Sequence, residues 1–372
     1  MKPAGPPTVE DLLQLLEVIA PSWAAEDWDR VGLVAGQGEW QLERVWVALE
    51  LSPELVAEAA ARGGGAVVVH HNPLFHPLSC INPSQPATAM LLKAVEAKLA
   101  VVAAHTNLDA APSGVNDHLA RAAGLSNLRV LRPMSQGLAK VVVFVPPEAL
   151  EQVARAAFRA GAGVIGDYEG CGFSCRGTGR FTPREGARPY QGEVGKSEEV
   201  EEQRFETVVP QARAHGVVQA IKAAHPYEEP VVEIYPLGQG PGGFGMGRVG
   251  ELNPPMPAQQ WLEQLMQRLG ARVGMVAGPQ PELVSTVAVV GGAGGEFLGD
   301  AARAGAQVLV TGEARYHQAE AAVQAGVWLV CLGHYETEAV VLEPLAQRIK
   351  EGLGVEVEVW DRGGPWQAVL KG

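Results

Sequence analysis

The chain has 372 residues, of which 47% are hydrophobic and 19% are charged. That composition is typical of a soluble protein that divides into two or three domains with real cores. The net charge is −13, whereas a non-specific nucleic-acid binder needs a basic face that displaces counterions. We therefore do not expect nucleic acid to be the main partner.

The N-terminal segment predicts an amphipathic helix that begins after Thr8. Glu10, Asp11 and Glu17 interrupt its apolar positions, which excludes a secretory signal peptide. No later segment reaches the roughly eighteen apolar residues that a membrane span needs. We expect a cytoplasmic protein with no membrane partner.

Two distant stretches of the chain share a strand–helix–strand pattern, and each leads into a further helix and buried strand. The first has elements at 45–49, 53–62, 66–69 and 99–104, and the second at 286–290, 296–304, 307–310 and 327–332. Such βαβ units form an open α/β sheet, whose ligands lie beyond the carboxyl ends of the strands. The sequence leaves open whether the likeness reflects an internal duplication or only the pattern that all βαβ units share.

The middle of the chain follows a different order, β-α-β-β-α-β, which is typical of a ferredoxin-like α+β domain. Its predicted elements are 140–145, 147–160, 170–181, 205–210, 211–224 and 231–236. Residues 129–248 contain 14 basic and 14 acidic residues, so the rest of the chain carries the whole charge of −13. We predict an α/β open-sheet core in two similar βαβ-containing halves, 1–127 and 248–372, interrupted by an inserted domain at 128–247.

Polar side chains with metal-binding chemistry follow several predicted strands. His70 and His71 close the apolar run that ends at Val69, and the turn after a strand can direct both imidazoles into one cleft. His105 and Asp109 follow the next strand, where a carboxylate could bridge two cations. Asp109 could equally cap a helix over 110–123.

A third motif lies after the strand at 327–332. His334 and Glu338 are four residues apart, so one helical turn places them on the same face. The alternative is that Thr337 caps this helix and Glu338 only complements its dipole.

Together these motifs offer three histidines and two carboxylates, with His105 beside them. Imidazole and carboxylate suit Zn, Mn, Fe or Ni. Five ligands exceed what one catalytic ion needs, and two divalent ions about 3.5–4 Å apart account for the number better.

These motifs carry a resemblance to a known family. The segments His70-His71-Asn-Pro-Leu-Phe-His76, His105-Thr-Asn-Leu-Asp109, Thr311-Gly-Glu-Ala-Arg-Tyr-His317 and Gly333-His334-Tyr-Glu-Thr-Glu338 resemble the dinuclear-metal-centre family of GTP cyclohydrolase 1 type 2 homologues. Trp28-Asp29-Arg30-Val31-Gly32-Leu33 is similar to that family's opening motif, although Asn is usual in place of Arg30. The insert, including Ala224 to Glu229, is similar to the PII/CutA-like domain of its longer members.

The resemblance implies several properties of this chain. It implies a toroidal homo-hexamer with two metal ions per chain. It implies metal ligands at His70, His71, Asp109, His334 and Glu338.

Further polar residues follow the strand at 307–310. We expect Thr311, Glu313, Tyr316 and His317 to contact the substrate or to orient a metal-bound histidine. Gly291–Gly295 follows a strand and precedes a helix, so it is either a tight turn or a loop that holds a substrate phosphate. We interpret His225 and Glu228-Glu229 as local structure or a subunit contact.

The preferred hypothesis is a metal-dependent hydrolase. Its substrate would be small and nucleotide-like, phosphorylated or a cyclic amide, attacked by a metal-bound hydroxide, with His105 as proton shuttle. The alternative is a regulatory or metal-handling hexameric scaffold without turnover, whose ring and insert bind partners or effectors.

Overall fold

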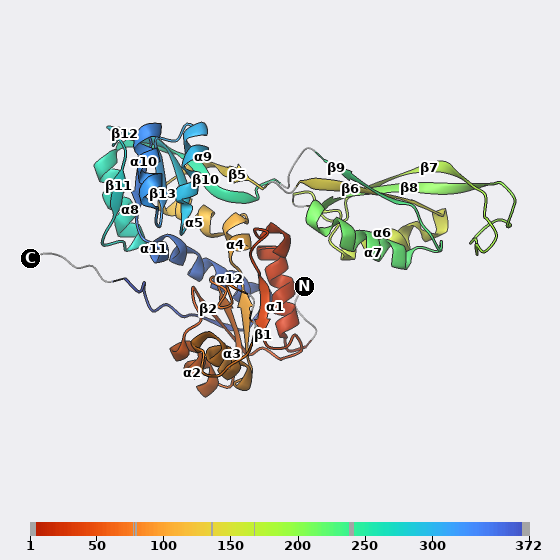
Figure 1. The fold of residues 1–372 in the computed structure, drawn as a ribbon, viewed down its shortest axis with the longest axis horizontal. Coiled ribbons are helices and arrows are strands. Elements are labelled where there is room, and N and C mark those ends of the chain that lie inside the picture. The colour runs from red at the N-terminus through yellow and green to blue at the C-terminus, as the bar shows by residue number, and fades with distance from the viewer. Residues whose placement is uncertain are drawn as a thin grey trace, which may run out of the picture. The chain divides into compact units, whose positions relative to one another are not determined.

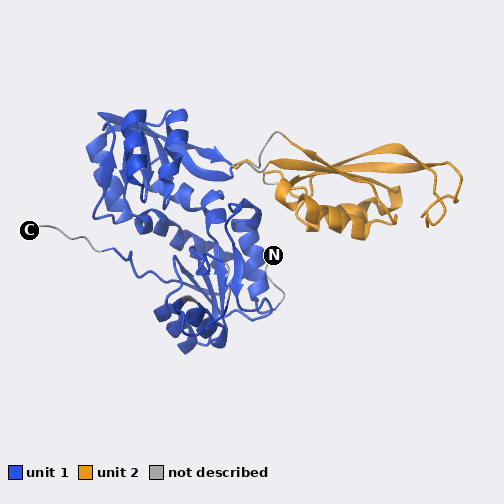
Figure 2. Cartoon of the chain, viewed as in Figure 1, with its two compact units in different colours: residues 1–133, 243–372 blue, residues 134–242 orange. Residues whose placement is uncertain are grey.

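The computed structural model describes residues 5–76, 78, 80–134, 137–166, 168–237 and 242–366. The chain forms two compact units, one made of Met1–Pro133 with Gly243–Gly372 and the other of Met134–Gly242 (Figure 2). Within the described ranges, every helix is too short or too polar to cross a membrane.

The first sheet of the core has five strands in the order β1-β4-β3-β2-β15. Its inner strands β3 and β4 are buried along their whole length, as expected for parallel strands covered on both faces. Helix α1 begins with the predicted capping box, in which Thr8 and Asp11 exchange hydrogen bonds. The strands of this sheet are β1 (Gly32–Ala35), β2 (Arg44–Ala48), β3 (Gly65–Val69), β4 (Leu99–Ala103) and β15 (Glu356–Val359). The helices that accompany it are α1 (Val9–Ile19), α2 (Pro53–Ala61), α3 (Pro86–Glu96) and α12 (Leu342–Leu353).

Two separate apolar clusters hold these helices to the first sheet. Leu12 of α1 and Leu345 of α12 pack with Val45 in one cluster. Leu55 of α2 and Leu91 of α3 pack on the opposite side. Short 3-10 helices cover Ser22–Ala24 and, before α12, Ala339–Val341.

The second sheet of the core has six strands in the order β11-β14-β13-β12-β10-β5. Strands β12, β13 and β14 are parallel, while β5, β10 and β11 pair antiparallel at the sides. Its strands are β5 (Ser126–Pro133), β10 (Gly245–Pro257), β11 (Met275–Ala277), β12 (Leu283–Val290), β13 (Val308–Thr311) and β14 (Trp328–Cys331). The accompanying helices are α5 (Val115–Ala122), α8 (Ala258–Leu269), α9 (Leu298–Arg303), which follows a 3-10 turn at Gly294–Phe297, and α10 (Tyr316–Ala325).

The two sheets do not correspond to the two halves of the sequence. Strand β15, near the C-terminus, pairs parallel with β2 of the first sheet. Strand β5, from the first half of the chain, pairs with β10 of the second sheet. The expectation of one open sheet is therefore wrong, because the core contains two sheets (Figure 1). Each of them includes a strand from the other half of the chain.

The inserted unit is a four-stranded antiparallel sheet in the order β7-β8-β6-β9, packed on two helices. This is the β-α-β-β-α-β arrangement expected from the sequence. Its elements are β6 (Leu138–Val145), α6 (Leu150–Arg159), β7 (Gly172–Phe181), β8 (Glu198–Pro210), α7 (Ala214–Ala224) and β9 (Val232–Pro236), with 3-10 turns at Pro147–Ala149 and Gln211–Arg213.

The insert boundaries expected at 128 and 247 fall inside strands of the core. Gly245 pairs with Pro133 and Met246 with Arg132 in the β5–β10 ladder. The backbone hydrogen bonds of this ladder make residues 128–133 and 245–247 part of the second sheet. The insert therefore spans residues 134–242.

This ladder predicts how the core responds to removal of the insert. Since Pro133 and Gly245 are paired, a linker of about four Gly/Ser residues can join Pro133 to Phe244 as a hairpin turn. We expect a soluble core with one cooperative thermal transition, measured by circular dichroism. A matched deletion of 128–247 should fold poorly, because it removes parts of β5 and β10. Equal stability of the two deletions would contradict the assignment of β5 to the core.

Candidate metal centre

His70 and His71 stand at the carboxyl end of β3 and continue its pairing with β2. Their backbone N–H groups donate to the carbonyl oxygens of Ala48 and Leu49. Nδ1 of His70 lies 2.9 Å from the carbonyl oxygen of Ala104, which fixes this nitrogen as the donor and leaves Nε2 free to bind a metal. Nδ1 of His71 lies 3.2 Å from Oε1 of Glu50, a residue just beyond β2.

Asp109 lies on α4 (Thr106–Ala110), the short helix that follows β4. Its Oδ1 is 3.6 Å from Nε2 of His70. Its carbonyl oxygen accepts a hydrogen bond from the side-chain amide of Asn116 on α5. The side chain of Asp109 therefore faces the histidine pair, and it does not cap a helix over 110–123.

His105 precedes α4 and lies beside both histidines of β3. Its ring centroid is 5.1 Å from that of His70 and 5.7 Å from that of His71. Nδ1 of His105 is 3.1 Å from Oδ2 of Asp29. The same carboxylate oxygen accepts hydrogen bonds from the backbone N–H and the hydroxyl of Thr106. These contacts orient the His105 ring.

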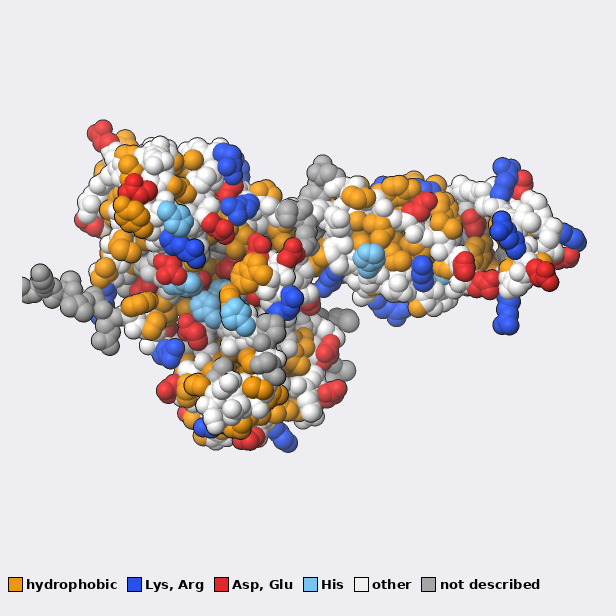
Figure 3. All heavy atoms as spheres, viewed as in Figure 1, with side chains coloured by type: hydrophobic (Ala, Val, Ile, Leu, Met, Phe, Trp, Pro, Cys, Tyr) orange, Lys and Arg blue, Asp and Glu red, His pale blue; other side chains and the backbone are white. Residues whose placement is uncertain are grey.

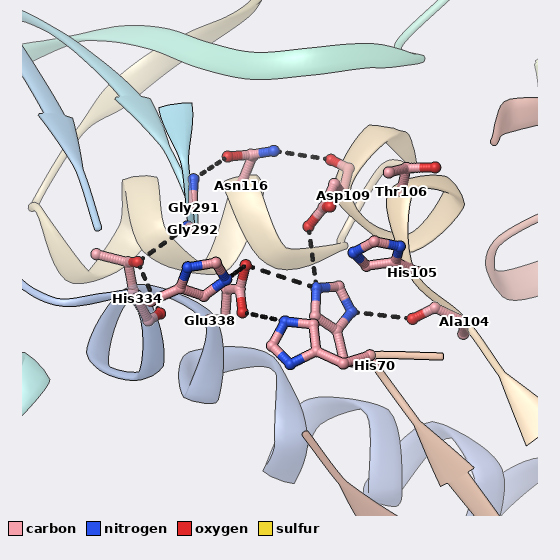
Figure 4. A network of polar contacts seen from close by, with 12 residues as sticks. His70, Ala104, His105, Thr106, Asp109, Asn116, Gly291, Gly292, His334 and Glu338 are labelled. Atoms are coloured by element: carbon pink, nitrogen blue, oxygen red, sulfur yellow. Dashed lines mark hydrogen bonds and ion pairs between the residues drawn. The ribbon is translucent and has the colours of Figure 1, made fainter. Parts of the chain in front are cut away.

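His334 and Glu338 are the first and last residues of α11 (His334–Glu338), which follows β14. Nε2 of His334 lies 3.1 Å from Oε1 of Glu338, in the i,i+4 arrangement expected from the sequence. Oε2 of Glu338 lies 2.9 Å from Nε2 of His71, and Oε1 lies 3.8 Å from Nε2 of His70. Glu338 is thus the carboxylate that reaches three imidazoles (Figure 4).

The site lies where the two sheets of the core meet. The first sheet supplies the residues after β3 and β4, and the second supplies the residues after β14. This corrects the expectation that all of them come from one sheet. Figure 3 shows histidine side chains clustered at the surface of the core.

Several nitrogen and oxygen atoms of the site are buried and lie in ion-pair contacts, but make no hydrogen bond of normal geometry within the described part of the chain. They are Nε2 of His70, Nε2 of His71, Nδ1 of His105, Oδ1 of Asp109 and Oε2 of Glu338. Buried polar atoms without partners are costly, and these are the atom types that bind divalent transition metals. Two sets with potential ligand atoms within 4.8 Å of one another share His71: His70 with His71 and His105, and His71 with His334 and Glu338. The residues present therefore fit a metal centre.

The buried charges shift one another's protonation in the metal-free site. Burial opposes the charged form of His71, but its close contacts with the carboxylates of Glu338 and Glu50 outweigh burial and raise its pKa to about 10. The hydrogen bond to Glu338 outweighs burial at His334 and raises its pKa to about 9. Burial would raise the pKa of Glu338, yet His334 and His70 hold it well below its usual range. The imidazoles therefore act as cations around this carboxylate.

Two further carboxyl groups of the site have opposite shifts. Burial raises the pKa of Asp109. Burial also opposes ionisation of Asp29, but hydrogen bonds from His105 and Thr106 outweigh it and lower its pKa to about 2. Asp29 is therefore a permanent anion behind His105.

The glycine loop after β12 contacts the site directly. A Cβ at Gly292, whose φ is +61°, would overlap Oε1 of Glu338 and lie 3.1 Å from Nε2 of His334. The N–H groups of Gly291, Gly292 and Gly294 donate to side chains of Asn116, Thr337 and Thr311. Because these three donors are already used, the geometry favours the tight-turn interpretation over a phosphate-binding loop.

The other predicted residues divide into two groups. Oε1 of Glu313 lies 2.8 Å from Nδ1 of His334, so Glu313 orients that imidazole. Thr311 is fully buried, and its hydroxyl holds the glycine loop. Tyr316 is 82% exposed and His317 is also exposed at the start of α10. Within the described residues, neither makes a hydrogen bond or ion pair with the clustered histidines.

Two contributors to the site were missed as functional residues from the sequence. Glu50 could have been found, because it directly follows the strand that pairs with β3. Asn116 had no such signal, since its role depends on bringing Asp109 and Gly291 together across the two sheets.

Known proteins resemble this chain in sequence and in fold. A bacterial relative from Bacillus subtilis, named GTP cyclohydrolase 1 type 2 homolog, is 38% identical over 341 residues, 91% of this chain and 91% of that protein. A homologue of the same name from Mycobacterium leprae is 37% identical over 368 residues, 96% of this chain and 94% of that protein. The crystal structure of a Bacillus cereus protein related to NIF3 matches with a TM-score of 0.79 and 35% identity, covering 98% of this chain and all of that one.

The family model for Duf34/NIF3 (NGG1p interacting factor 3) matches residues 7–363 of the chain. With this match and these relatives, the chain belongs to the Duf34/NIF3 family.

Proposed function

We propose that the protein is a dinuclear metal-dependent hydrolase. His70, His71, Asp109, His334 and Glu338 would hold two divalent ions of Zn, Mn, Fe or Ni. The observation that carries this proposal is the group of buried imidazole nitrogens and carboxylate oxygens that face one another without hydrogen bonds of normal geometry. Such a centre would supply Lewis-acid polarisation of a scissile group and an acidified water.

The chain's own groups fix the direction of the proposed ligands. The Ala104 carbonyl, Glu50 and Glu313 each contact Nδ1 of a different histidine, and so direct the Nε2 atoms inward. Carboxylate and carbonyl partners of this kind also raise the basicity of a ligating imidazole. Glu338 is the carboxylate best placed to be shared, since it reaches three imidazoles.

His105 is the proposed proton shuttle. It lies near the site but is additional to the five ligands, and Asp29 is placed to accept from its Nδ1. An anion in that position fixes the tautomer and the orientation of the ring. The edge of Trp28 packs against the ring with a centroid distance of 5.9 Å.

The substrate would be a small nucleotide-like, phosphorylated or cyclic amide compound. Trp28 is 57% exposed and Phe75 is 63% exposed, and their ring centroids are 5.6 Å apart. Exposed aromatic faces next to His105 suit stacking with a planar ring. This contact supports the nucleotide-like and cyclic amide classes.

A scaffold without turnover is the second candidate. His105 shares a ligand-atom cluster with His70 and His71. If it also bound metal, six protein ligands would leave fewer positions for a substrate. In that case the protein would store or sense metal, with the insert binding an effector.

We propose the assembly and the identity of the insert from the resemblance stated above. The chain would form a cytoplasmic homo-hexamer, and residues 134–242 would be a PII/CutA-like domain. The strand order β7-β8-β6-β9 supports this identity for the insert.

Glu338→Gln tests the metal centre. It preserves side-chain volume but removes the charge that faces three imidazoles. Metal content by elemental analysis should fall from about two ions per chain to below one. Glu343→Gln, an exposed change at the start of α12, should retain both ions. A wild-type protein that stays metal-free after incubation with Zn or Mn would contradict the dinuclear assignment.

Gly292→Ala tests the close approach of the glycine loop. Its Cβ would overlap Oε1 of Glu338, so metal content should fall although the protein folds. Gly305→Ala is the matched control, because Gly305 also has positive φ but its Cβ would meet no atom within 4 Å. Gly305→Ala should lose only about 1 kcal/mol of unfolding free energy and keep its metal. Equal metal content in both variants would show that the approach is unimportant.

His105→Ala separates the hydrolase from the scaffold. We expect both ions to remain bound while turnover falls by about 10²–10⁴-fold, the usual contribution of one general acid or base. The measurement combines elemental analysis with a screen of nucleotides, phosphodiesters and cyclic amides. Loss of an ion would make His105 a ligand. Absence of turnover in fully metallated wild-type protein would favour the scaffold.

A further inference from the structure

The inserted unit contains a cavity of about 560 Å³ that the proposed metal chemistry does not use. It lies between the β7–β8 hairpin, the connection 182–197 and the segment 225–231. Strands β7 and β8 run on past α6 and α7 toward that connection (Figure 1). The cavity is therefore formed within this unit alone.

A buried carboxylate lines the cavity. Glu202 of β8 is only 9% exposed. A Cβ at Gly179 would overlap its Oε2, so the side chain lies directly against the backbone of β7. No cationic side chain among the described residues forms an ion pair with Glu202. A buried anion without such a partner is unfavourable.

An aromatic hydroxyl lies beside this carboxylate. The OH group of Tyr227 is buried and makes no hydrogen bond of normal geometry with the described residues. Burial and the nearby Glu202 raise the pKa of Tyr227, so the group stays protonated and can donate or accept. The ring of Tyr190 lies 5.9 Å from that of Tyr227. Both rings line the cavity.

The other charges of the lining leave its interior acidic. Three arginines of the lining pair with carboxylates outside it: Arg176 with Glu201, Arg180 with Glu199 and Arg204 with Glu206. Glu228 accepts a hydrogen bond from a backbone N–H, and Glu229 has no ion pair in the described part of the unit. The three arginines of the lining are thus neutralised, whereas its glutamates form no ion pair among the described residues.

From this arrangement we propose that the insert binds a small organic cation, an aryl or alkyl ammonium, with its charge at Glu202 and its apolar part against Tyr190 and Tyr227. Aromatic faces attract cations through their quadrupole, and the attraction strengthens in a desolvated site. The ammonium N–H groups would donate to Glu202 and to the Tyr227 hydroxyl oxygen. The apolar part would pack against the exposed sides of the two rings, which contact each other.

Calorimetric titration of the full chain with phenethylammonium and with 2-phenylethanol tests this proposal. The two probes share a ring and an ethyl chain and differ in charge. The ammonium should bind at least about tenfold more tightly, as expected for a hydrogen bond to a charged group. Equal affinity of the two probes, or no binding of either, would overturn the proposal.

Variants locate the binding site. Glu202→Gln and Tyr190→Ala should each weaken phenethylammonium binding roughly tenfold. Glu185→Gln removes one exposed charge from the same unit outside the lining, and it should bind as the wild type does. Thermal unfolding confirms that each variant is folded. Unchanged binding in folded Glu202→Gln would overturn the assignment. Loss of binding when the protein self-associates would also overturn it, because a second copy of the chain would then occupy the cavity.

Discussion

The carboxylate of Glu338 is buried, and its oxygens lie between 2.9 and 3.8 Å from the Nε2 atoms of His71, His334 and His70. A buried charge is tolerated only when opposite charges and hydrogen bonds surround it. In this protein two of those partners follow a strand of the first sheet, and the third is on the helix after β14 of the second. Because groups from both sheets compensate this one charge, the two sheets have to keep a fixed position relative to each other.

Exchange of strands between the two halves of the chain fixes this relative position. Strand β15 pairs with β2, and β5 pairs with β10, so each sheet contains a strand from the other half. Arg248 on β10 is 3% exposed and donates to the carbonyl oxygen of Ala111, just after α4. Asn116 links the Asp109 carbonyl to the N–H of Gly291. These hydrogen bonds tie helix α4, which follows the first sheet and carries Asp109, to the second sheet.

The sequence predicted the elements of this architecture better than their assembly. Buried parallel strands such as β3 and β4 are continuous apolar runs in the sequence. The polar residues that follow them could therefore be identified as candidate metal ligands. Strands β1, β11 and β15 are short and partly exposed at the sheet sides, and their local patterns did not predict them. Without β15 and β5, nothing indicated that the core has two sheets.

The same limit applies to individual residues of the candidate site. The i,i+4 spacing of His334 and Glu338 was visible in the chain, because a helix turn relates them locally. The position of Glu338 against His70 and His71 was not, because it depends on how two sheets meet. Tyr316 and His317 show the converse. They belong to a recognisable motif, but they lie exposed at the start of α10.

Glycine has one physical role at both sites of the molecule. Gly292 admits the carboxylate of Glu338, and Gly179 admits that of Glu202, since a Cβ at either position would overlap a carboxylate oxygen. The two carboxylates differ in what surrounds them. Glu338 has three imidazoles of its own chain, which are also ligands that a metal ion can use. Glu202 has a tyrosine hydroxyl and aromatic rings beside it, and no cationic side chain among the described residues forms an ion pair with it. In our proposal the compensating charge comes from a bound molecule, and the aromatic rings favour an organic cation over a hydrated metal ion.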